Sequence, residues 1–578
     1  MACLNITING RQIEAQAGQT VLQAATANDI EIPVLCNHPA LQPQGSCRMC
    51  LVEIEKQRSL QPACTFPVTD GMVIKTESEK VQAARKFVLE LLFSERIHYC
   101  MYCPMSGTDE STDCDLQRLG YRYGLTHWEY APNYKKRWPV DASRTYFILD
   151  HSRCILCRCC VRACDEIAAN HTIGVKDRGA RTMIIADMDV PFGASSCVSC
   201  GTCLQVCPTG ALMDRRSAYM GLHTDVEHVK TTCMACPVGC GIEAITRDRL
   251  LLRAEGDWDA ANAGLLCVTG RFEVVEPQPA RIQQPMIKRN GDWVNVTLDE
   301  ALDVVASRLK SAGPVAGLVT PRATGETMTA FHRFFEEVLR SDQAGLLYGE
   351  MPPTGFGALA TLQDLSNADC VVVVNGEPLQ DQKVLGYITK RAVDHGARLV
   401  VVNDAPTQLD PWAGVTLPLA TIAEIAPMVD AAQHPVVLYA GGLAPAAYDV
   451  LRALPVQTRF LPLYEGTNTA GAARLGLSAR RVQGSALFLL AGDEAKADHG
   501  LTLPETAFTV VQAAYHTAWT EAADVVLPAP VWTEQTGHIV NVEGRELPVN
   551  PSITAPQGIE PVESVLIKLA AHLGHGLN

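Results

Sequence analysis

Apolar and polar residues alternate at the start of the chain. Over residues 4–15 the apolar positions Leu4, Ile6, Ile8 and Ile13 follow the two-residue period of paired strands. The next segments predict a helix over 20–30, strands over 49–54 and 72–74, and an amphipathic helix over 78–93. We therefore expect a small α+β domain at the start of the chain, followed by a helix.

From about residue 280 the pattern becomes an alternation of short apolar runs and helical periods. The runs predict buried strands over 315–320, 370–375, 399–403, 436–439, 486–490 and 508–512. Helices are predicted between them, for example over 298–309 and 326–339. Alternation of this kind indicates parallel α/β sheets, so the chain is expected to be multidomain, with α+β domains before α/β domains.

Composition and charge exclude several classes of protein. The 578 residues carry 48 basic and 63 acidic side chains, a net charge of -15, which argues against nucleic acid or an anionic membrane as a partner. No apolar run of about 18 residues predicts a membrane-spanning helix. The first residues lack the basic and apolar regions of a secretory signal, so we expect a cytoplasmic protein.

The 22 cysteines are unevenly placed, because all except Cys370 lie within the first 267 residues. In a chain without an export signal, dense cysteines indicate metal binding rather than disulfides. Cys370 opens an apolar run and is expected to be a small buried residue, and Cys3 needs no function.

The first cysteine group has four members: Cys36, Cys47, Cys50 and Cys64. Two irons bridged by two sulfides need four thiolates, so this group predicts a [2Fe-2S] cluster in a ferredoxin-like domain. The alternative is a structural zinc site. Such sites usually use two close pairs of ligands, whereas only Cys47 and Cys50 are close here.

The second group has three cysteines, Cys100, Cys103 and Cys114, with His98 two residues upstream of the first. A [4Fe-4S] cluster on these thiolates needs a fourth ligand, and an imidazole usually raises the reduction potential. A histidine beside a cysteine is more often incidental. Because one ligand position is empty, we expect His98 to fill it.

The third group contains two motifs of the two-cluster ferredoxin type, in which the fourth cysteine of each motif binds the other cluster. This spacing predicts one [4Fe-4S] cluster on Cys154, Cys157, Cys160 and Cys207 and another on Cys164, Cys197, Cys200 and Cys203. Cys159 lies out of phase inside the first motif and is expected not to be a ligand.

The fourth group is a complete quartet that predicts a further [4Fe-4S] cluster: Cys233, Cys236, Cys240 and Cys267. Five clusters form a relay for single electrons, which needs a donor and an acceptor at its ends. No Gly-x-Gly-x-x-Gly follows a predicted strand and no flavin motif is evident, so these partners are expected on other chains.

The order of the four groups resembles the large, G-type iron–sulfur subunit of respiratory complex I. It resembles even more closely the alpha subunit of soluble NAD-linked formate dehydrogenases. Typical stretches of these families are SERIHYC at 94–100, ADVVLPA at 523–529 and EQTGHIVNVEGR at 534–545. The last two belong to the molybdopterin oxidoreductase superfamily, and they imply its α/β fold for the second half. The double motif of the third group is similar to that of the formate dehydrogenase subunit, whereas the common complex I subunit has a single cluster at this place.

Four departures from the family imply a second half without molybdenum or tungsten. The segment 346–357 has no cysteine, selenocysteine or histidine to bind the metal, and Thr269 stands where a lysine is usual. Asp404, Ala405 and Pro406 replace the usual Asp-Pro-Arg, and the sequence ends at Asn578 without a C-terminal barrel domain. A pterin cofactor is therefore not expected.

The resemblance and the cysteine groups together imply five domains. These are a [2Fe-2S] domain over 1–78, a His-Cys3 [4Fe-4S] domain over 79–120, a two-cluster ferredoxin domain over 141–225, a [4Fe-4S] domain over 226–282 and α/β domains over 283–578.

The resemblance implies an electron-relay subunit of a soluble NAD(H)-linked complex. The expected partners are an FMN- and NAD(H)-binding subunit, a thioredoxin-like [2Fe-2S] subunit and a further redox module such as a hydrogenase or reductase. Two alternatives stay open: a catalytic molybdenum or tungsten formate dehydrogenase subunit, and a structural or assembly scaffold. Metal analysis distinguishes the relay subunit from the first alternative. Reduction of the clusters by NADH distinguishes it from the second.

Overall fold

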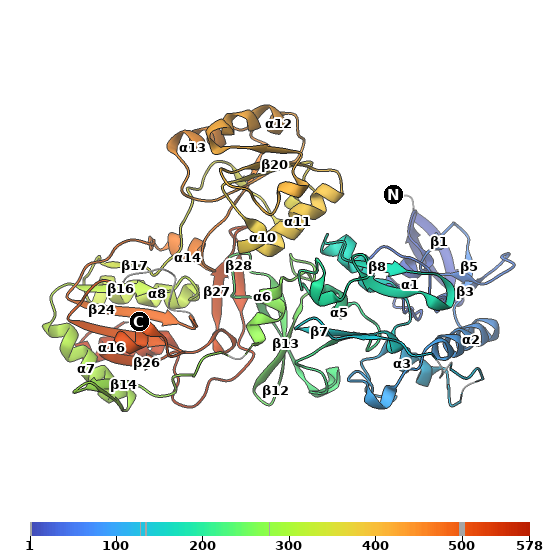
Figure 1. The fold of residues 1–578 in the computed structure, drawn as a ribbon, viewed down its shortest axis with the longest axis horizontal. Coiled ribbons are helices and arrows are strands. Elements are labelled where there is room, and N and C mark those ends of the chain that lie inside the picture. The colour runs from blue at the N-terminus through green and yellow to red at the C-terminus, as the bar shows by residue number, and fades with distance from the viewer. Residues whose placement is uncertain (1–2, 128, 133–135, 277, 496–502, 578) are drawn as a thin grey trace. The chain divides into compact units, whose positions relative to one another are not determined.

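The computed structural model describes residues 3–127, 129–132, 136–276, 278–495 and 503–577. These residues form two compact units, a first unit at Met1–Val226 and a second unit at Glu227–Asn578 (Figure 1). Each unit is described by itself.

The first unit begins with a five-stranded sheet in the order β2-β1-β5-β3-β4. Its elements are β1 (Cys3–Ile8), β2 (Arg11–Gln16), α1 (Val21–Thr26), β3 (Leu51–Ile54), β4 (Gln61–Pro62) and β5 (Val73–Lys75). Strands β1 and β2 form the expected antiparallel pair, with Ile6 opposite Ile13. The inward-facing side chains of the sheet and of α1 form one buried apolar core, which includes Cys50 and Cys64.

The expected helix over 20–30 is wrong in its length, because α1 ends at Thr26. A capping box of Thr20 and Gln23 begins the helix. Its end is set by Asn28, whose side-chain amide donates to the carbonyl of Ala24, and by Asp29, whose φ of 58° is left-handed. Both features turn the chain away from the helical path.

Two helices carry the second cysteine group: α2 (Glu79–Glu95) and α3 (Asp115–Arg122). Helix α2 is joined to the first sheet by Arg85, which is fully buried and donates to the carbonyl of Leu51 in β3 at 2.8 Å. The same guanidinium pairs with Glu77 at 3.0 Å.

The third cysteine group lies among short elements. These are β6 (Val140–Asp141), β7 (Phe147–Asp150), α4 (Cys159–Arg162), a π-helical turn η3 (Ala163–Ile167), β8 (Ile173–Lys176), β9 (Met183–Ala186), α5 (Thr202–Gln205) and β10 (Leu212–Asp214). They make one sheet in the order β10-β7-β6 and the hairpin β8-β9. With so little regular structure, much of the buried interior consists of cysteine side chains.

The second unit starts with the antiparallel sheet β11-β12-β13, which carries the fourth cysteine group at its ends. Its elements are β11 (Glu227–Thr232), β12 (Gly241–Arg247), β13 (Leu250–Gly256) and α6 (Val268–Arg271). The hairpin β27 (Gly537–Val540) and β28 (Glu546–Val549) packs against it, with Met234, Ile539 and Val549 in one buried cluster.

The seven-stranded sheet of the second unit has the order β15-β14-β26-β25-β24-β16-β17. Its strands are β14 (Met286–Arg289), β15 (Asp292–Asn295), β16 (Val315–Val319), β17 (Ala344–Leu346), β24 (Ala486–Gly492), β25 (Phe508–Ala513) and β26 (Val525–Pro528). The last five pair in parallel, and β14 pairs antiparallel with β15 and β26. Helices α7 (Leu298–Ser311), α8 (Gly325–Arg333) and α16 (Val562–Leu573) share one hydrophobic core with the sheet (Figure 1).

The six-stranded sheet has the order β18-β23-β22-β19-β20-β21, and all its pairs are parallel. Its strands are β18 (Ala358–Leu359), β19 (Cys370–Val374), β20 (Arg398–Val402), β21 (Val415–Leu417), β22 (Pro435–Tyr439) and β23 (Arg459–Pro462). The covering helices include α9 (Leu362–Ser366), α11 (Lys383–Asp394), α12 (Ala426–Asp430) and α13 (Pro445–Arg452). The parallel α/β architecture predicted from the second half is confirmed.

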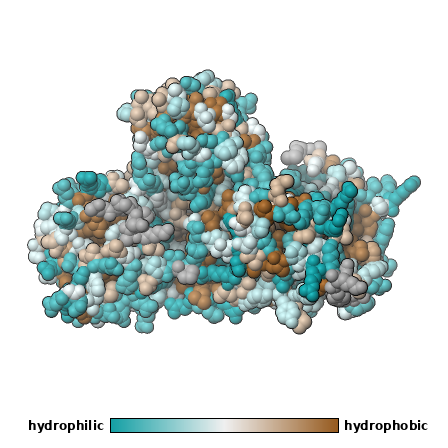
Figure 2. All heavy atoms as spheres, in the orientation of Figure 1, coloured by the Kyte–Doolittle hydropathy of each residue, from teal (hydrophilic) through white to brown (hydrophobic). Residues whose placement is uncertain are grey.

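The molecular surface is mostly polar on the face shown in Figure 2, with hydrophobic side chains interspersed. Among the described residues, no helix is both long enough and apolar enough to cross a membrane.

Candidate metal centres

The first cysteine group is assembled by the loop before β3 and the turn after β4. The side chains of Cys36 and Cys47 contact each other, as do those of Cys50 and Cys64. The backbone N–H of Cys47 donates to Sγ of Cys36 at 3.3 Å. Gly45 has a left-handed φ of 66° and presents its N–H to Cys64, an arrangement that suits a sulfur carrying negative charge.

The second group brings its three cysteines together around the turn Cys100–Tyr102 and the start of α3. Burial first, and then the neighbouring Cys103, raise the pKa of Cys100, and burial raises that of Cys114 to about 12. Such shifts indicate that these thiols become thiolates only beside a compensating cation.

His98 lies against the end of α2, with its ring edge-to-face on Phe93 at a centroid distance of 5.4 Å. The ring has a hydrogen bond with the backbone of Leu92, whereas its Nε2 atom is buried and has no hydrogen-bond partner among the described residues. Burial lowers the pKa of this imidazole to about 4, so the ring is neutral. A histidine binds a metal as a neutral ring, with one nitrogen held by a hydrogen bond and the other nitrogen available to the metal.

The structure brings cysteines of the two motifs of the third group together. The thiols of Cys154, Cys157, Cys160 and Cys207 line one small cavity. Cys164 lies near Cys200 of the second motif, since burial and then this neighbour raise its pKa to about 12. Backbone N–H groups donate to Sγ of Cys154 and of Cys197, each at 3.4 Å.

The fourth group lies between β11 and β12 and at the start of α6. Burial and then Cys267 raise the pKa of Cys233 to about 12, and Cys236 and Cys240 also interact with Cys267. A Cβ on Gly270 would lie 3.3 Å from Sγ of Cys233 and 4.0 Å from Sγ of Cys267, so the glycine leaves room beside these sulfurs. The N–H of Gly270 also donates to Sγ of Cys267 at 3.4 Å.

The donor sets fit iron–sulfur clusters in their chemistry, because the third group offers eight thiols and each of the other groups four soft or imidazole ligands, in largely buried loops. In the part of the chain that the structure describes, no three His, Cys, Asp or Glu side chains converge closely enough to hold a single metal ion.

Buried arginines connect the cysteine groups of the first unit, which the sequence did not reveal. Arg96 is 1% exposed and donates to the carbonyls of His151 and Thr182, each at 2.7 Å, which joins the second group to the third. Arg153 donates to the carbonyl of Tyr102 at 2.7 Å and pairs with Asp150 at 3.3 Å. These contacts hold the two groups in one rigid arrangement.

Arg162 makes the corresponding connection between the third group and the first. Its guanidinium donates to the carbonyl of Cys36 at 2.6 Å, to the carbonyl of Gln42, and to Sγ of Cys159 at 3.4 Å. Cys159 in turn contacts Cys157, so its buried side chain lies between Arg162 and the third group.

Replacing Arg162 with methionine is expected to loosen the loop that carries Cys36. Two charge-assisted hydrogen bonds to carbonyls are lost, and each contributes about 1.5–3 kcal/mol. We expect amide exchange over residues 35–42 to correspond to a local stability lower by about 3 kcal/mol. The exposed Arg216, replaced in the same way, is the matched control. Equal exchange in both variants would show that Arg162 is not a connector.

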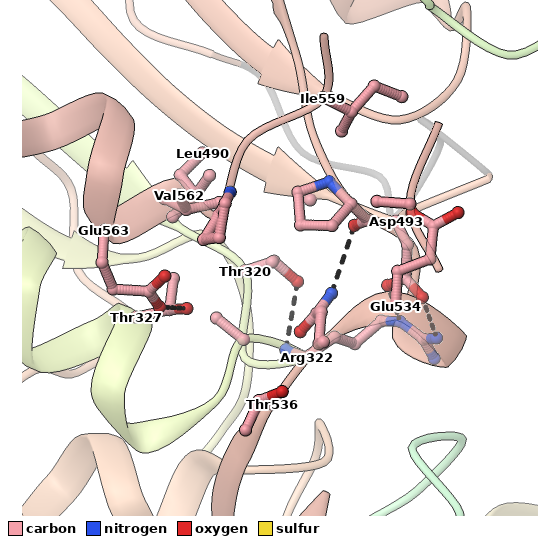
Figure 3. Close-up of a pocket in the computed structure, with 16 residues that line it drawn as sticks. Thr320, Arg322, Thr327, Leu490, Asp493, Glu534, Thr536, Ile559, Val562 and Glu563 are labelled. Atoms are coloured by element: carbon pink, nitrogen blue, oxygen red, sulfur yellow. Dashed lines mark hydrogen bonds and ion pairs between the residues drawn. The ribbon is translucent and has the colours of Figure 1, made fainter. Parts of the chain in front are cut away.

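A pocket of about 170 Å³ lies at the carboxyl ends of β16 and β24 (Figure 3). Arg322 and Asp493 form a two-pronged ion pair in its wall, with distances of 3.0 and 3.2 Å. Glu534 pairs with Arg281 at 2.5 Å and Glu563 accepts from Thr327. Tyr348 lies in the segment where the family resemblance places a metal ligand, and here its hydroxyl donates to Glu494 at 2.6 Å.

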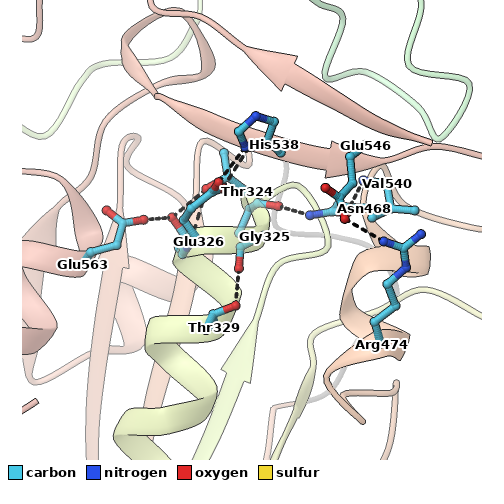
Figure 4. Close-up of polar contacts among 12 residues, drawn as sticks. Thr324, Gly325, Glu326, Thr329, Asn468, Arg474, His538, Val540, Glu546 and Glu563 are labelled. Carbon is cyan, nitrogen blue, oxygen red and sulfur yellow. Dashed lines mark hydrogen bonds and ion pairs between the residues drawn. The ribbon is translucent and has the colours of Figure 1, made fainter. Parts of the chain in front are cut away.

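The hairpin β27–β28 contacts the loop that carries Cys236 and Cys240 of the fourth group. The N–H of Val542 donates to the carbonyl of Pro237 at 2.9 Å. His538 of the hairpin contacts Glu326 of α8, with Nδ1 2.7 Å from Oε1 (Figure 4). The N–H of Val540 donates to Oδ1 of Asn468 at 2.9 Å. The stretch 534–545, which the sequence singled out only by resemblance, therefore supports the Cys236–Cys240 loop.

Profiles of known families match nearly the whole chain. They are a "2Fe-2S iron-sulfur cluster binding domain" at 2–79, the "NADH-ubiquinone oxidoreductase-G iron-sulfur binding region" at 85–128, a "4Fe-4S dicluster domain" at 153–211, the "Molybdopterin oxidoreductase Fe4S4 domain" at 226–274 and "Molybdopterin oxidoreductase" at 281–433 and 458–558.

Curated relatives include complex I subunits and another oxidoreductase. A G-type NADH-quinone oxidoreductase subunit of Rhizobium meliloti is 32% identical, over 72% of this chain and 49% of that protein. NADH-quinone oxidoreductase subunit 3 of Thermus thermophilus is 27% identical, over 99% of this chain and 83% of that protein. NADPH-Fe(3+) oxidoreductase subunit alpha of Geobacter sulfurreducens is 31% identical, over 71% of this chain and 49% of that protein. The chain thus matches about half the length of the first and third relatives.

Proposed function

Because this chain belongs to the family of G-type iron–sulfur subunits of complex I, we propose that it is the electron-relay subunit of an NAD(H)-linked oxidoreductase complex. The observation that carries the proposal is the grouping of the ligands. The third group sorts its cysteines across the two motifs, and buried or half-buried arginines tie the first three groups into one unit.

We assign one [2Fe-2S] cluster to the first group, in a ferredoxin-like domain, and one [4Fe-4S] cluster each to the other sets. The ligands are Cys36, Cys47, Cys50 and Cys64; His98, Cys100, Cys103 and Cys114; Cys154, Cys157, Cys160 and Cys207; Cys164, Cys197, Cys200 and Cys203; and Cys233, Cys236, Cys240 and Cys267. We propose the same domain boundaries as those expected from the sequence.

The bound clusters supply one-electron transfer. The residues of this chain bury the ligand sulfurs from water, donate N–H groups to them, and hold successive ligand loops at constant separation. Arg96, Arg153 and Arg162 do the last of these, since each reaches from one cysteine group to the backbone of another. A guanidinium suits this task because its donors are planar and its charge is permanent.

We propose that the α/β half of the chain has no molybdenum or tungsten pterin and no active site of its own. The segment 346–357, where the resemblance places the metal ligand, contains neither cysteine nor histidine. At the switch point between β19 and β22, where a dinucleotide binds in such folds, Glu350 lies against Gly441, and its carboxylate would repel phosphate groups.

The expected partners follow from the relatives and from the absence of a nucleotide fingerprint in this sequence. We propose an FMN- and NAD(H)-binding subunit, a thioredoxin-like [2Fe-2S] subunit and a further redox module such as a hydrogenase or reductase. Near the second group, Met101 is 91% exposed and Tyr102 68%, and the hydroxyl of Tyr219 donates to the carbonyl of Tyr102 at 2.6 Å. Exposed apolar side chains of this kind suit contact with another protein. The need for reduced thiols favours a cytoplasmic location.

Metal analysis of the anaerobically purified chain tests the proposal. Five clusters correspond to about 18 iron atoms per chain, with neither molybdenum nor tungsten. About one molybdenum or tungsten per chain would contradict the proposal and favour a catalytic formate dehydrogenase subunit. Iron that NADH does not reduce in the presence of the partner subunits would favour a scaffold.

A further inference from the structure

Arg322 lies between the fourth cysteine group and the pocket of the second unit. It follows β16, and one arm of its guanidinium donates to the carbonyl of Met234 at 3.0 Å. Met234 is the residue after Cys233, so the charge of Arg322 is held against the loop that carries three proposed ligands, Cys233, Cys236 and Cys240. The other donors of the guanidinium face Asp493 at 3.0 and 3.2 Å (Figure 3).

The pair is largely enclosed and firmly placed. The side chain of Arg322 is 21% exposed and that of Asp493 is 4% exposed. Asp493 also accepts from the N–H of Trp532 at 3.1 Å, and the carbonyl of Met234 accepts from the Thr467 hydroxyl at 2.7 Å. Both ends of the contact are therefore anchored by other groups.

The positive charge of Arg322 lies closer to the loop of the fourth group than the negative charges around it. The guanidinium contacts the loop of the fourth group directly, whereas Asp493 is bound on the side of the pocket, at the end of β24. Glu494 lies beyond, where it accepts from the hydroxyls of Thr320 and Tyr348, each at 2.6 Å. Thr269, two residues after Cys267, is uncharged and donates to Glu273 at 2.6 Å.

We propose that Arg322 is a positioning residue that raises the reduction potential of the cluster held by Cys233, Cys236, Cys240 and Cys267, and that Asp493 limits this effect. The inference rests on the proposed function, since it requires that the fourth group holds a cluster. Arg322 contacts no ligand atom and acts through the backbone of Met234 and through its charge.

The physical reason is the charge change on reduction. A reduced cluster carries one more negative charge than the oxidised one, so a permanent positive charge nearby stabilises the reduced form. Burial makes the interaction stronger than it is in water, because the surroundings have a low effective dielectric. A carboxylate paired with the arginine cancels part of the effect, and its removal leaves the positive charge uncompensated.

Redox titration of the full chain, monitored by electron paramagnetic resonance, tests the inference. The signal of the fourth cluster is assigned as the one lost in Cys267→Ser. We expect Arg322→Gln to lower its midpoint potential and Asp493→Asn to raise it, each by a tenfold change in the reduction equilibrium, about 59 mV. The double variant is expected to lie between the two, and Arg322→Lys to shift less than Arg322→Gln.

The two opposite signs distinguish this role from a structural one, since a loosened loop shifts the potential in one direction for both variants. The exposed Arg333 on α8, replaced by glutamine, is the charge-matched control and is expected to leave the potential unchanged. Unchanged potentials in both variants, or shifts of the same sign, would overturn the inference while the proposed function stands. A wild-type chain with no signal that depends on Cys267 would overturn both.

Discussion

Replacing His98 with alanine is expected to remove about one iron atom or more of the four held by the second group and to abolish its [4Fe-4S] signal. Three thiolates cannot complete the cluster, and the bare Nε2 of His98 is the only fourth donor proposed for this group. Iron content and electron paramagnetic resonance of the reduced chain measure the loss.

Replacing His98 with cysteine separates ligand loss from local damage. This variant restores a fourth ligand but adds a negative charge, so we expect a full iron content and a potential lower by on the order of 100 mV. The exposed His127, replaced by alanine, is the matched control. If the alanine variant at 98 keeps the iron and the signal of the wild type, His98 is not a ligand.

Removal of iron by an anaerobic chelator is expected to unfold residues 151–211 while the second unit stays folded. In this segment the helices and strands are three to five residues long, and the buried interior depends on Cys154, Cys157, Cys160 and Cys164. Without iron, these thiols have only each other, and the binding free energy of the clusters is also folding free energy. The amides are expected to exchange at least about 100-fold faster, which corresponds to a loss of about 2.8 kcal/mol in the free energy of protection.

The second unit provides the internal control for this experiment. Its seven-stranded sheet has an apolar core of its own, in which Phe331, Phe334, Phe335 and Phe488 are fully buried. Protection in β16 and β24 is therefore expected to survive chelation. Hydrogen exchange that stays slow over 151–211 after complete loss of iron would show that the polypeptide alone maintains this fold.

The sequence determined the main elements of the α/β half because their signals are local. The runs at 370–375 and 486–490 became β19 and β24, whose residues are all buried, as strands of a parallel sheet covered on both faces require. The helix expected over 20–30 ended early because Asn28 and Asp29 formed specific turn contacts. The antiparallel edge made by β14 and β15 was not predicted, since strand pairing depends on residues far apart in the chain.

The sequence by itself also predicted the cysteine groups, because the ligands of a cluster lie in short motifs with characteristic spacing. Only the tertiary structure revealed what holds the groups to each other. Arg162 reaches Cys36 across 126 positions, and Arg322 reaches Met234 across 88. In the sequence these are ordinary charged residues, and the same letters describe an exposed arginine such as Arg216. Their role follows from burial and from the partners that folding brings to them, and neither is encoded in local spacing.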